Sequence, residues 1–263
     1  MDVQVVISDT RKAVVRNLEQ TLGTFASQFR PDRVKVYIHH GSIEDWDEPG
    51  VCFINAGNAL GHMTGALDRT LLRLMPDVDR DVHAMIQLWG STARDGTRHL
   101  PLFSAMLSHA NNRWLITSPC MFVAGPQDFR GTRNAFHATH AALSMLVSAN
   151  RAGMGIRRVV MTGVCTGHGR MNRDDAAKQM ADAFRAVFLN DLLDIDLHQA
   201  LHPRLMLLPR YEYQPVVPAH DRFLPREMWV NRDGTHELHP PAKTQPVQKR
   251  SGGSQDAHPF LIG

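Results

Sequence analysis

The sequence has few cysteines, few aromatic residues and no long apolar run. Only three of its 263 residues are cysteines, so they cannot all pair within one chain, and a disulfide-stapled secreted scaffold is not expected. No apolar stretch approaches the roughly 20 residues that span a bilayer. A strand-like run begins at Val3 without a basic, cleavable leader before it. We therefore expect an intracellular, cytoplasmic protein without a membrane partner.

An excess of one charge is also lacking. The 29 Lys and Arg residues and the 26 Asp and Glu residues leave a formal net charge of +3, and no dense Lys/Arg stripe occurs. This balance is compatible with an anionic ligand and gives little support to nucleic-acid binding. Hydrophobic residues make up 43% of the chain and charged residues 21%, as in ordinary globular domains.

Strand-like and helix-like patterns alternate along most of the chain. The predicted strands, each a short apolar or β-branched run, are 3–7, 34–38, 51–55, 157–161 and 205–208. The predicted helices, each with apolar residues three or four apart, are 14–25, a segment from about 65, 82–88, 132–150 and a segment capped by Asn172. The runs 102–108 and 114–117 flank a turn-like cluster and predict an antiparallel hairpin. Ser8, Asp9 and Thr10 are N-cap candidates for the first helix. The alternation predicts an α/β fold whose sheet is covered on both faces.

The composition changes near the end of the chain. Prolines become frequent after about residue 213, and residues 251–254 form a flexible Ser-Gly-Gly-Ser run. Few apolar residues remain there to offset the entropy of ordering. We expect one domain over residues 1–212 and a Pro-rich tail over 213–263, disordered except where Phe223-Leu224 and Met228-Trp229-Val230 dock onto the domain.

Two strand-to-helix loops carry the candidate ligand-binding residues. The later loop reads Val164-Cys165-Thr166-Gly167-His168-Gly169-Arg170, and it matches neither a Walker-A nor a Rossmann pattern. Its small residues let the backbone approach a ligand, and successive N–H groups with the following helix dipole attract an anion such as a diphosphate. A tight chain reversal without a ligand would explain the same glycines.

The earlier loop runs from Asn55 to Gly65. The amide of Asn58 can both donate to and accept from ribose hydroxyls, and the neighbouring glycines leave space for a ligand. The alternative is a loop held by Asx turns, in which Asn58 needs no ligand.

Together the two loops resemble those of the macro domain family, and most closely of the macro-like proteins of bacteria and phages. The run Asn55-Ala56-Gly57-Asn58 is similar to the family's Asn-Ala-Ala-Asn element, and Thr166 to Gly169 is similar to its diphosphate-binding loop. Further segments that match the macro-like group are Gly41-Ser42-Ile43, Gly61, Met63, Gly65, Arg170-Met171 and Ala176-Ala177-Lys178-Gln179-Met180, and Ser118-Pro119-Cys120-Met121 resembles its Ala-Pro-Thr-Met strand end.

This resemblance implies a three-layer α/β/α sandwich with a mixed central sheet and an ADP-ribose cleft at one end of it, without a metal or redox cofactor. It implies that Ser42 and Ile43 lie near the adenine, Asn58 near the distal ribose and the later loop around the diphosphate. Arg170 adds charge near a phosphate or is a solvated surface residue. The expected ligand-binding residues are Ser42, Ile43, Asn55, Asn58, Gly61, Thr64, Val164, Cys165, Thr166, Gly167, His168, Gly169 and Arg170.

Catalysis is less clearly indicated than binding. Macro enzymes that remove ADP-ribose from carboxylates usually carry an Asp in the first loop, whereas this chain has Thr64, which cannot act as a carboxylate base. The catalytic candidates are therefore Asn58, which would position the distal ribose, and His62 and His168, whose imidazoles could orient water or protonate a leaving group. Both histidines also fit solvent-facing loop positions.

Two further groups of reactive side chains have simpler explanations. Cys165 could be a low-pKa thiolate beside a helix N-terminus, or only the small residue that the turn requires. His137 and His140 have a metal-compatible spacing, but no Cys/His set completes a four-ligand site, so no metal is expected.

Three functions remain open from the sequence. The first is hydrolysis of an ADP-ribosyl linkage, or of a phosphate on an ADP-ribose derivative, with a bound water as nucleophile. The second is a reader of ADP-ribose, a related nucleotide or an ADP-ribosylated protein, which the loss of the loop Asp at Thr64 favours. The third is an assembly component with a vestigial cleft, whose Pro-rich tail binds a partner.

Overall fold

The computed structural model describes residues 3–24, 28–29 and 34–189, and three short strands at 228–230, 236–238 and 261–262. The predicted strand at 205–208, the expected domain boundary at 212 and the segment Phe223-Leu224 lie outside the described residues. The run Met228-Trp229-Val230, expected to dock onto the domain, is strand β9 and pairs with β10 (His236–Leu238) in a separate two-stranded sheet.

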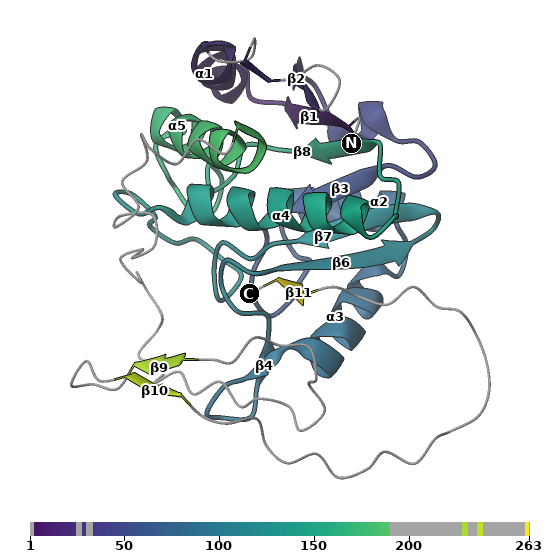
Figure 1. Cartoon of the computed structure of the whole chain (residues 1–263), viewed down its shortest axis with the longest axis vertical. Helices are drawn as coiled ribbons and strands as arrows, with labels where there is room; N and C mark the ends of the chain where they lie inside the picture. The colour runs from purple at the N-terminus through teal and green to yellow at the C-terminus, as the bar shows by residue number, and fades with distance from the viewer. Residues whose placement is uncertain are drawn as a thin grey trace.

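The centre of the fold is a mixed seven-stranded sheet in the order β11-β6-β7-β3-β8-β1-β2 (Figure 1). Its strands are β1 (Val3–Asp9), β2 (Val34–His40), β3 (Cys52–Asn55), β6 (Ala105–Ala110), β7 (Arg113–Thr117), β8 (Arg158–Met161) and β11 (Leu261–Ile262). The five strands from β7 to β2 are parallel to their neighbours, whereas β6 and β11 are antiparallel. The strands predicted at 3–7, 34–38, 51–55 and 157–161 are confirmed as β1, β2, β3 and β8.

Five α-helices surround this sheet in the described part of the chain. They are α1 (Lys12–Gly23), α2 (Ala66–Leu74), α3 (Val78–Trp89), α4 (Asn134–Arg151) and α5 (Arg173–Phe184). Short additional elements are the 3₁₀ turn η2 (Ile43–Trp46), the π turn η3 (Arg185–Leu189) and the small pair β4 (Ser91–Thr92) and β5 (Arg98–His99). Each predicted helix is confirmed. No helix of the described residues is long and apolar enough to cross a membrane.

Alternating strand residues build a separate apolar core on each face of the sheet. On β1, Val5 and Ile7 pack toward the layer of α1, α4 and α5, whereas Val6 packs toward α2 and α3. On β8, Val159 and Val160 divide in the same way. A sheet covered on both faces requires such continuously apolar strands. The expected three-layer α/β/α sandwich with a mixed sheet is therefore confirmed, as Figure 1 shows.

The predicted hairpin is also present, as β6 and β7. Its turn consists of Asn111 and Asn112, whose φ angles of 51° and 57° lie in the left-handed region. Asparagine tolerates this region better than most residues, and two consecutive left-handed residues match the twist of a two-residue hairpin.

The parallel strands determine where a site can form. Because β1, β3, β7 and β8 run in one direction, their carboxyl ends at Asp9, Asn55, Thr117 and Met161 meet at one edge of the sheet. In open α/β sheets this edge is where ligands bind. The two loops singled out in the sequence follow β3 and β8, so the fold brings them to the same edge.

Candidate functional site

A cleft of about 490 Å³ opens at the edge where the parallel strands end. Its walls come from the loops after β1, β2, β3 and β8, with additional residues that follow β7. The volume falls within the roughly 300–1,000 Å³ of small-molecule sites. The cleft therefore combines both candidate loops in a space suited to a nucleotide-sized ligand.

Most of the predicted binding residues line this cleft. They are Ser42, Ile43, Asn55, Asn58, Thr64, Val164, Cys165, Gly167, His168 and Gly169. Gly61, Thr166 and Arg170 do not line it, and neither does His62. Gly61 instead has a φ of 72°, and a Cβ there would meet the side chains of Ile86 and Val82. Arg170 is exposed, has a φ of 50° and serves as a turn residue that donates its N–H to the carbonyl of Gly167.

The loop after β8 holds a row of backbone N–H groups without a protein acceptor. Within the described residues, no hydrogen bond uses the N–H groups of residues 165–169. The carbonyls of His168 and Gly169 accept from the N–H groups of Gln127 and Phe129, each at 2.8 Å. The segment 127–129 thus binds the carbonyl oxygens of the loop after β8, and the N–H groups of that loop are not used in these contacts. Successive N–H groups without protein acceptors are the feature from which an anion-binding nest is built, and residues 165–169 are called the nest below.

Close packing explains why this loop requires small residues. A Cβ on Gly169 would lie 2.5 Å from the ring of Phe129 and 2.7 Å from the carbonyl oxygen of Cys165. At Gly163, a Cβ would meet Val14 at 2.5 Å. Gly167 lines the cleft and has open space around it, so packing does not require glycine at this position.

The N-terminus of the helix that follows is less open to an anion than the sequence suggested. Helix α5 begins at Arg173, and its predicted N-cap Asn172 is confirmed, accepting from the N–H of Asp174 at 2.8 Å. Asp174 and Asp175 already place negative charge in the first turn. The protein's own carboxylates therefore already interact with the helix dipole, and the N–H groups of residues 165–169 are the donors that remain open at this loop.

The thiol of Cys165 is not activated. Burial raises the pKa of Cys165 well above its usual value, and the adjacent thiol of Cys120 raises it further. The reactive form of cysteine is the thiolate, which these surroundings disfavour. Of the two interpretations of Cys165, the structure favours the small buried residue in a left-handed turn, with a φ of 61°.

The amide of Asn58 is used within its own loop. Its Nδ2 donates to the carbonyl of His62 at 2.7 Å, and its Oδ1 accepts from the N–H of His62 at 3.1 Å. The residue is only 4% exposed. Asn58 lines the cleft and at the same time fixes the loop, as the Asx-type alternative predicts.

The two candidate catalytic histidines do not share the cleft. His168 is exposed and lines it. The ring of His62 lies 5.9 Å from that of His83, centroid to centroid, and His62 is not part of the cleft wall. His62 is exposed, and its backbone rather than its imidazole makes the contacts with Asn58 that hold the loop.

One carboxylate of the cleft, in the helix that follows the earlier loop, was not predicted from the sequence. Asp68 of α2 is 8% exposed and lines the cleft. It accepts from Nδ2 of Asn55 and from the N–H of Gly65, both at 2.8 Å. An acid three residues after a helix N-cap is the capping-box signal that could have identified it. The cleft therefore contains a carboxylate one helical turn beyond Thr64.

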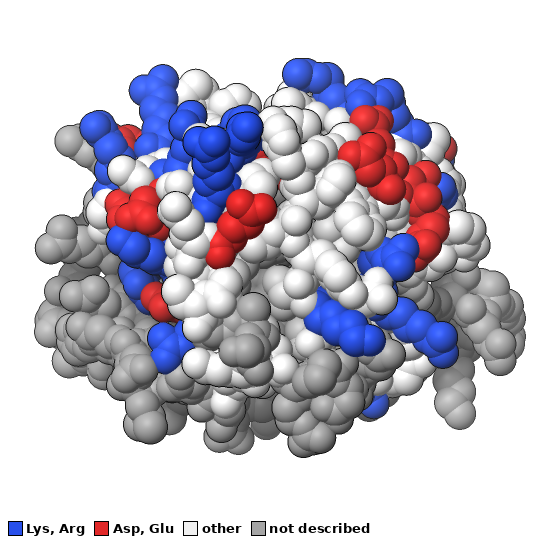
Figure 2. Space-filling view, turned by 90° about the horizontal axis from the view of Figure 1, so that it is seen from above, with Lys and Arg blue, Asp and Glu red and all other residues white. Residues whose placement is uncertain are grey.

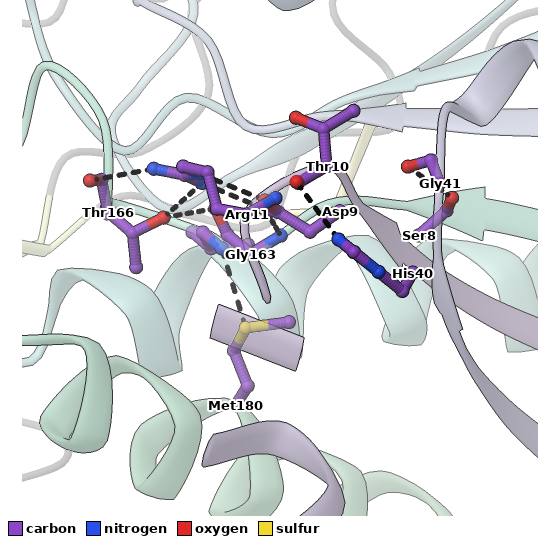
Figure 3. Close-up of polar contacts among 10 residues, drawn as sticks. Ser8, Asp9, Thr10, Arg11, His40, Gly41, Gly163, Thr166 and Met180 are labelled. Carbon is purple, nitrogen blue, oxygen red and sulfur yellow. Dashed lines mark hydrogen bonds and ion pairs between the residues drawn. The ribbon is translucent and has the colours of Figure 1, made fainter. Parts of the chain in front are cut away.

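An arginine of the first loop was missed as well. Ser8, Asp9 and Thr10 were expected to cap α1, but its N-cap is Arg11, without a side-chain cap. The carboxylate of Asp9 instead pairs with Arg11 at 2.8 Å, and Arg11 reaches Thr166 of the later loop (Figure 3). Both Asp9 and Arg11 line the cleft. The loops after β1 and β8 are thus joined at its wall.

The opposite wall is formed by the turn between β2 and η2. The hydroxyl of Ser42 accepts from the N–H of Glu44 at 3.2 Å, and the N–H of Ser42 donates to Asp45 at 2.9 Å. The hydroxyl of Ser8 lies within hydrogen-bond distance of the carbonyls of Gly41 and Ser42. These contacts fix Ser42 and the buried Ile43 in the cleft wall.

The described residues contain no group of three or more His, Cys, Asp or Glu side chains that could hold a metal ion. His137 and His140 lie on α4, outside the cleft wall. Burial lowers the pKa of His137 to about 4, with Arg133 and His140 adding to the effect.

The surface charge is mixed. On the face shown in Figure 2, Lys and Arg side chains stand among Asp and Glu side chains, with uncharged surface between them. A nucleic-acid backbone is bound by a track of cations that neutralises successive phosphates. The coloured residues of this face form no such track.

Neither a protein-family model nor a curated protein matches this sequence. Among solved structures, the fold is similar to the macrodomain of Mycobacterium tuberculosis DarG, with a TM-score of 0.41 and 13% identity over 54% of this chain and 84% of that chain. It is also similar to an alphavirus P23pro-zbd structure, with a TM-score of 0.27 and 16% identity over 53% of this chain and 22% of that chain.

Proposed function

We propose that this chain is a macro-type domain that binds ADP-ribose, or a related nucleoside diphosphate, in the cleft at the carboxyl ends of its parallel strands. The observation that carries the proposal is the row of backbone N–H groups at 165–169, which have no acceptor among the described residues. Gly167 and His168 of this row are exposed, so their N–H groups are open to a ligand, and an anionic oxygen can accept from several of them at once. A phosphate at this loop supplies such oxygens.

The rest of the cleft suits the nucleoside end of the ligand. Ile43 and Leu67 give the same cleft apolar surface on which a base can lie. The glycines at 57 and 65 keep the earlier loop close to the cleft without filling it. A ligand with a base, sugars and a phosphate-rich middle therefore matches the distribution of apolar and polar groups.

Calorimetric titration of the full chain tests this proposal. ADP-ribose should bind with measurable heat and raise the melting temperature, whereas ribose, which lacks phosphate, should do neither. Adenosine should bind at least tenfold more weakly than ADP-ribose, because it leaves the nest empty. Equal affinities for adenosine and ADP-ribose, or no binding of ADP-ribose at millimolar concentration, would overturn the assignment.

Hydrolysis of an ADP-ribosyl or ADP-ribose-phosphate linkage is a second candidate function. Asp68 favours it, because a buried carboxylate in the cleft can take a proton from an attacking water. The proposed roles for Asn58 and His168 in this reaction are to shape the ribose end and to protonate the leaving group. Incubation with mono-ADP-ribosylated protein and with ADP-ribose-1″-phosphate should release product from the wild type and not from Asp68→Asn. Binding of ADP-ribose without product release would leave the chain a reader.

A further inference from the structure

The side chain of Arg11 connects two loops of the cleft (Figure 3). Its Nε donates to Oδ1 of Asp9 at 2.9 Å, and its Nη2 donates to Oδ2 of Asp9 at 2.8 Å and to Oγ1 of Thr166 at 2.7 Å. Its Nη1 donates to the carbonyl oxygen of Thr166 at 3.0 Å. These contacts use four of the five N–H donors that a guanidinium carries. One N–H on Nη1 therefore has no acceptor among the described residues.

The carboxylate of Asp9 is fully engaged. Its Oδ1 accepts from the backbone N–H of Arg11 at 2.9 Å, and its Oδ2 accepts from the N–H of Gly163 at 3.2 Å, in addition to the guanidinium. Asp9 is 4% exposed. A paired, buried carboxylate with both oxygens occupied holds a guanidinium in one orientation. Asp9 thus orients Arg11, and its oxygens are already occupied by hydrogen bonds within the protein.

The orientation of Thr166 completes the arrangement. Its hydroxyl donates to the carbonyl of Gly163 at 3.0 Å, which leaves the oxygen free to accept from Arg11. Thr166 lies between Cys165 and Gly167, whose N–H groups belong to the nest. The guanidinium is therefore fixed directly beside the nest, while its side chain remains 39% exposed.

We propose that Arg11 contacts a second phosphate of the ligand, next to the phosphate held by the nest. The nest and Arg11 then supply separate donors for adjacent phosphates, so the cleft selects diphosphates over monophosphates. The remaining N–H of Nη1 and the positive charge of the guanidinium meet an oxygen of this second phosphate. This inference rests on the proposed function, and it adds Arg11 as the residue through which the cleft distinguishes a diphosphate from a monophosphate.

Calorimetry with ADP-ribose, ADP and AMP tests the inference on the full chain. In Arg11→Gln, the Kd of ADP-ribose and ADP should rise at least tenfold, which is about 1.4 kcal/mol, whereas the Kd of AMP should change less than threefold. The dependence of the ADP-ribose Kd on salt should weaken, because one charge no longer contacts phosphate. Lys12→Gln is the matched control, since it removes the same charge from the next residue, which is exposed and outside the cleft wall.

Two outcomes separate this inference from the proposed function. If the wild type binds ADP-ribose and Arg11→Gln weakens all three ligands equally, Arg11 only shapes the loop and the inference fails alone. If the wild type binds none of the ligands, the proposed function itself fails. Arg11→Lys keeps the charge and replaces the Gln variant in the test if that variant does not fold. The Kd of AMP divided by the Kd of ADP-ribose should be at least threefold smaller in Arg11→Lys than in the wild type, and an unchanged ratio would contradict the contact.

Discussion

Replacing Gly169 with alanine should destabilise the domain, whereas the same change at Gly167 should not. A Cβ at Gly169 would lie 2.5 Å from the ring of Phe129, which is 1% exposed and held in the core, and 2.7 Å from a backbone oxygen. Neither neighbour is the free end of a flexible side chain, so the loop or the ring must move. Forcing extra volume into a packed site costs about 1–3 kcal/mol.

The matched substitution, Gly167→Ala, causes no steric clash. No heavy atom lies within 4 Å of a Cβ at Gly167, so Gly167→Ala should remain within about 1 kcal/mol of the wild type, with a gain from the lower entropy of the unfolded chain. Urea unfolding followed by circular dichroism measures both free energies. For a loss of about 2 kcal/mol, the melting temperature falls by about 4–8 °C. Equal stability of the two variants would refute the packing described for the loop.

Three further predictions follow from the contacts of the cleft and of α4. Asn58→Ala should cost about 1–3 kcal/mol in urea unfolding, because it leaves the N–H and carbonyl of His62 without partners; a loss below 0.5 kcal/mol would contradict a loop-fixing role. Asp68→Ala should destabilise the domain more than Asp68→Asn, which retains an acceptor for Asn55 or Gly65. The pKa of His137 is about 4 in the folded protein, against an ordinary value of 6.5. As the pH drops from 6.5 toward 4, His137 is protonated in the unfolded chain before it is protonated in the folded one, so the free energy of unfolding should fall. His137→Gln should reduce this pH dependence in urea unfolding.

The fold was largely predictable because its signals are local. The apolar runs of β1 and β8 and the spacing of apolar residues in α1 and α5 are each read within one segment. The two-residue strands β4 and β5 carry no such pattern, since their pairing depends on a turn and not on alternation. The N-cap of α1 was misplaced because the carboxylate of Asp9 accepts from Arg11 and Gly163 and does not cap the helix.

The candidate site was predictable only where its residues are neighbours in the sequence. The loop at 164–170 could be singled out as a candidate because its small residues are consecutive. The hydrogen bonds from Arg11 to Thr166 were not predicted because 155 positions separate the two residues, and no local sequence pattern indicates that they are in contact. The prediction of His62 and His168 as catalytic candidates assumed that both side chains enter the space between their loops. The backbone of His62 is bound by Asn58, and this contact directs the loop in a way that the sequence does not show.

The most direct test of anion binding places a charge in the open space at Gly167. Gly167→Asp and Gly167→Asn have side chains of nearly the same shape and differ by one negative charge beside the nest. Calorimetry with ADP-ribose should give a Kd at least tenfold weaker for the Asp variant than for the Asn variant, while both melt at nearly the same temperature without ligand. Equal affinities of the two variants for ADP-ribose would contradict a phosphate in this loop.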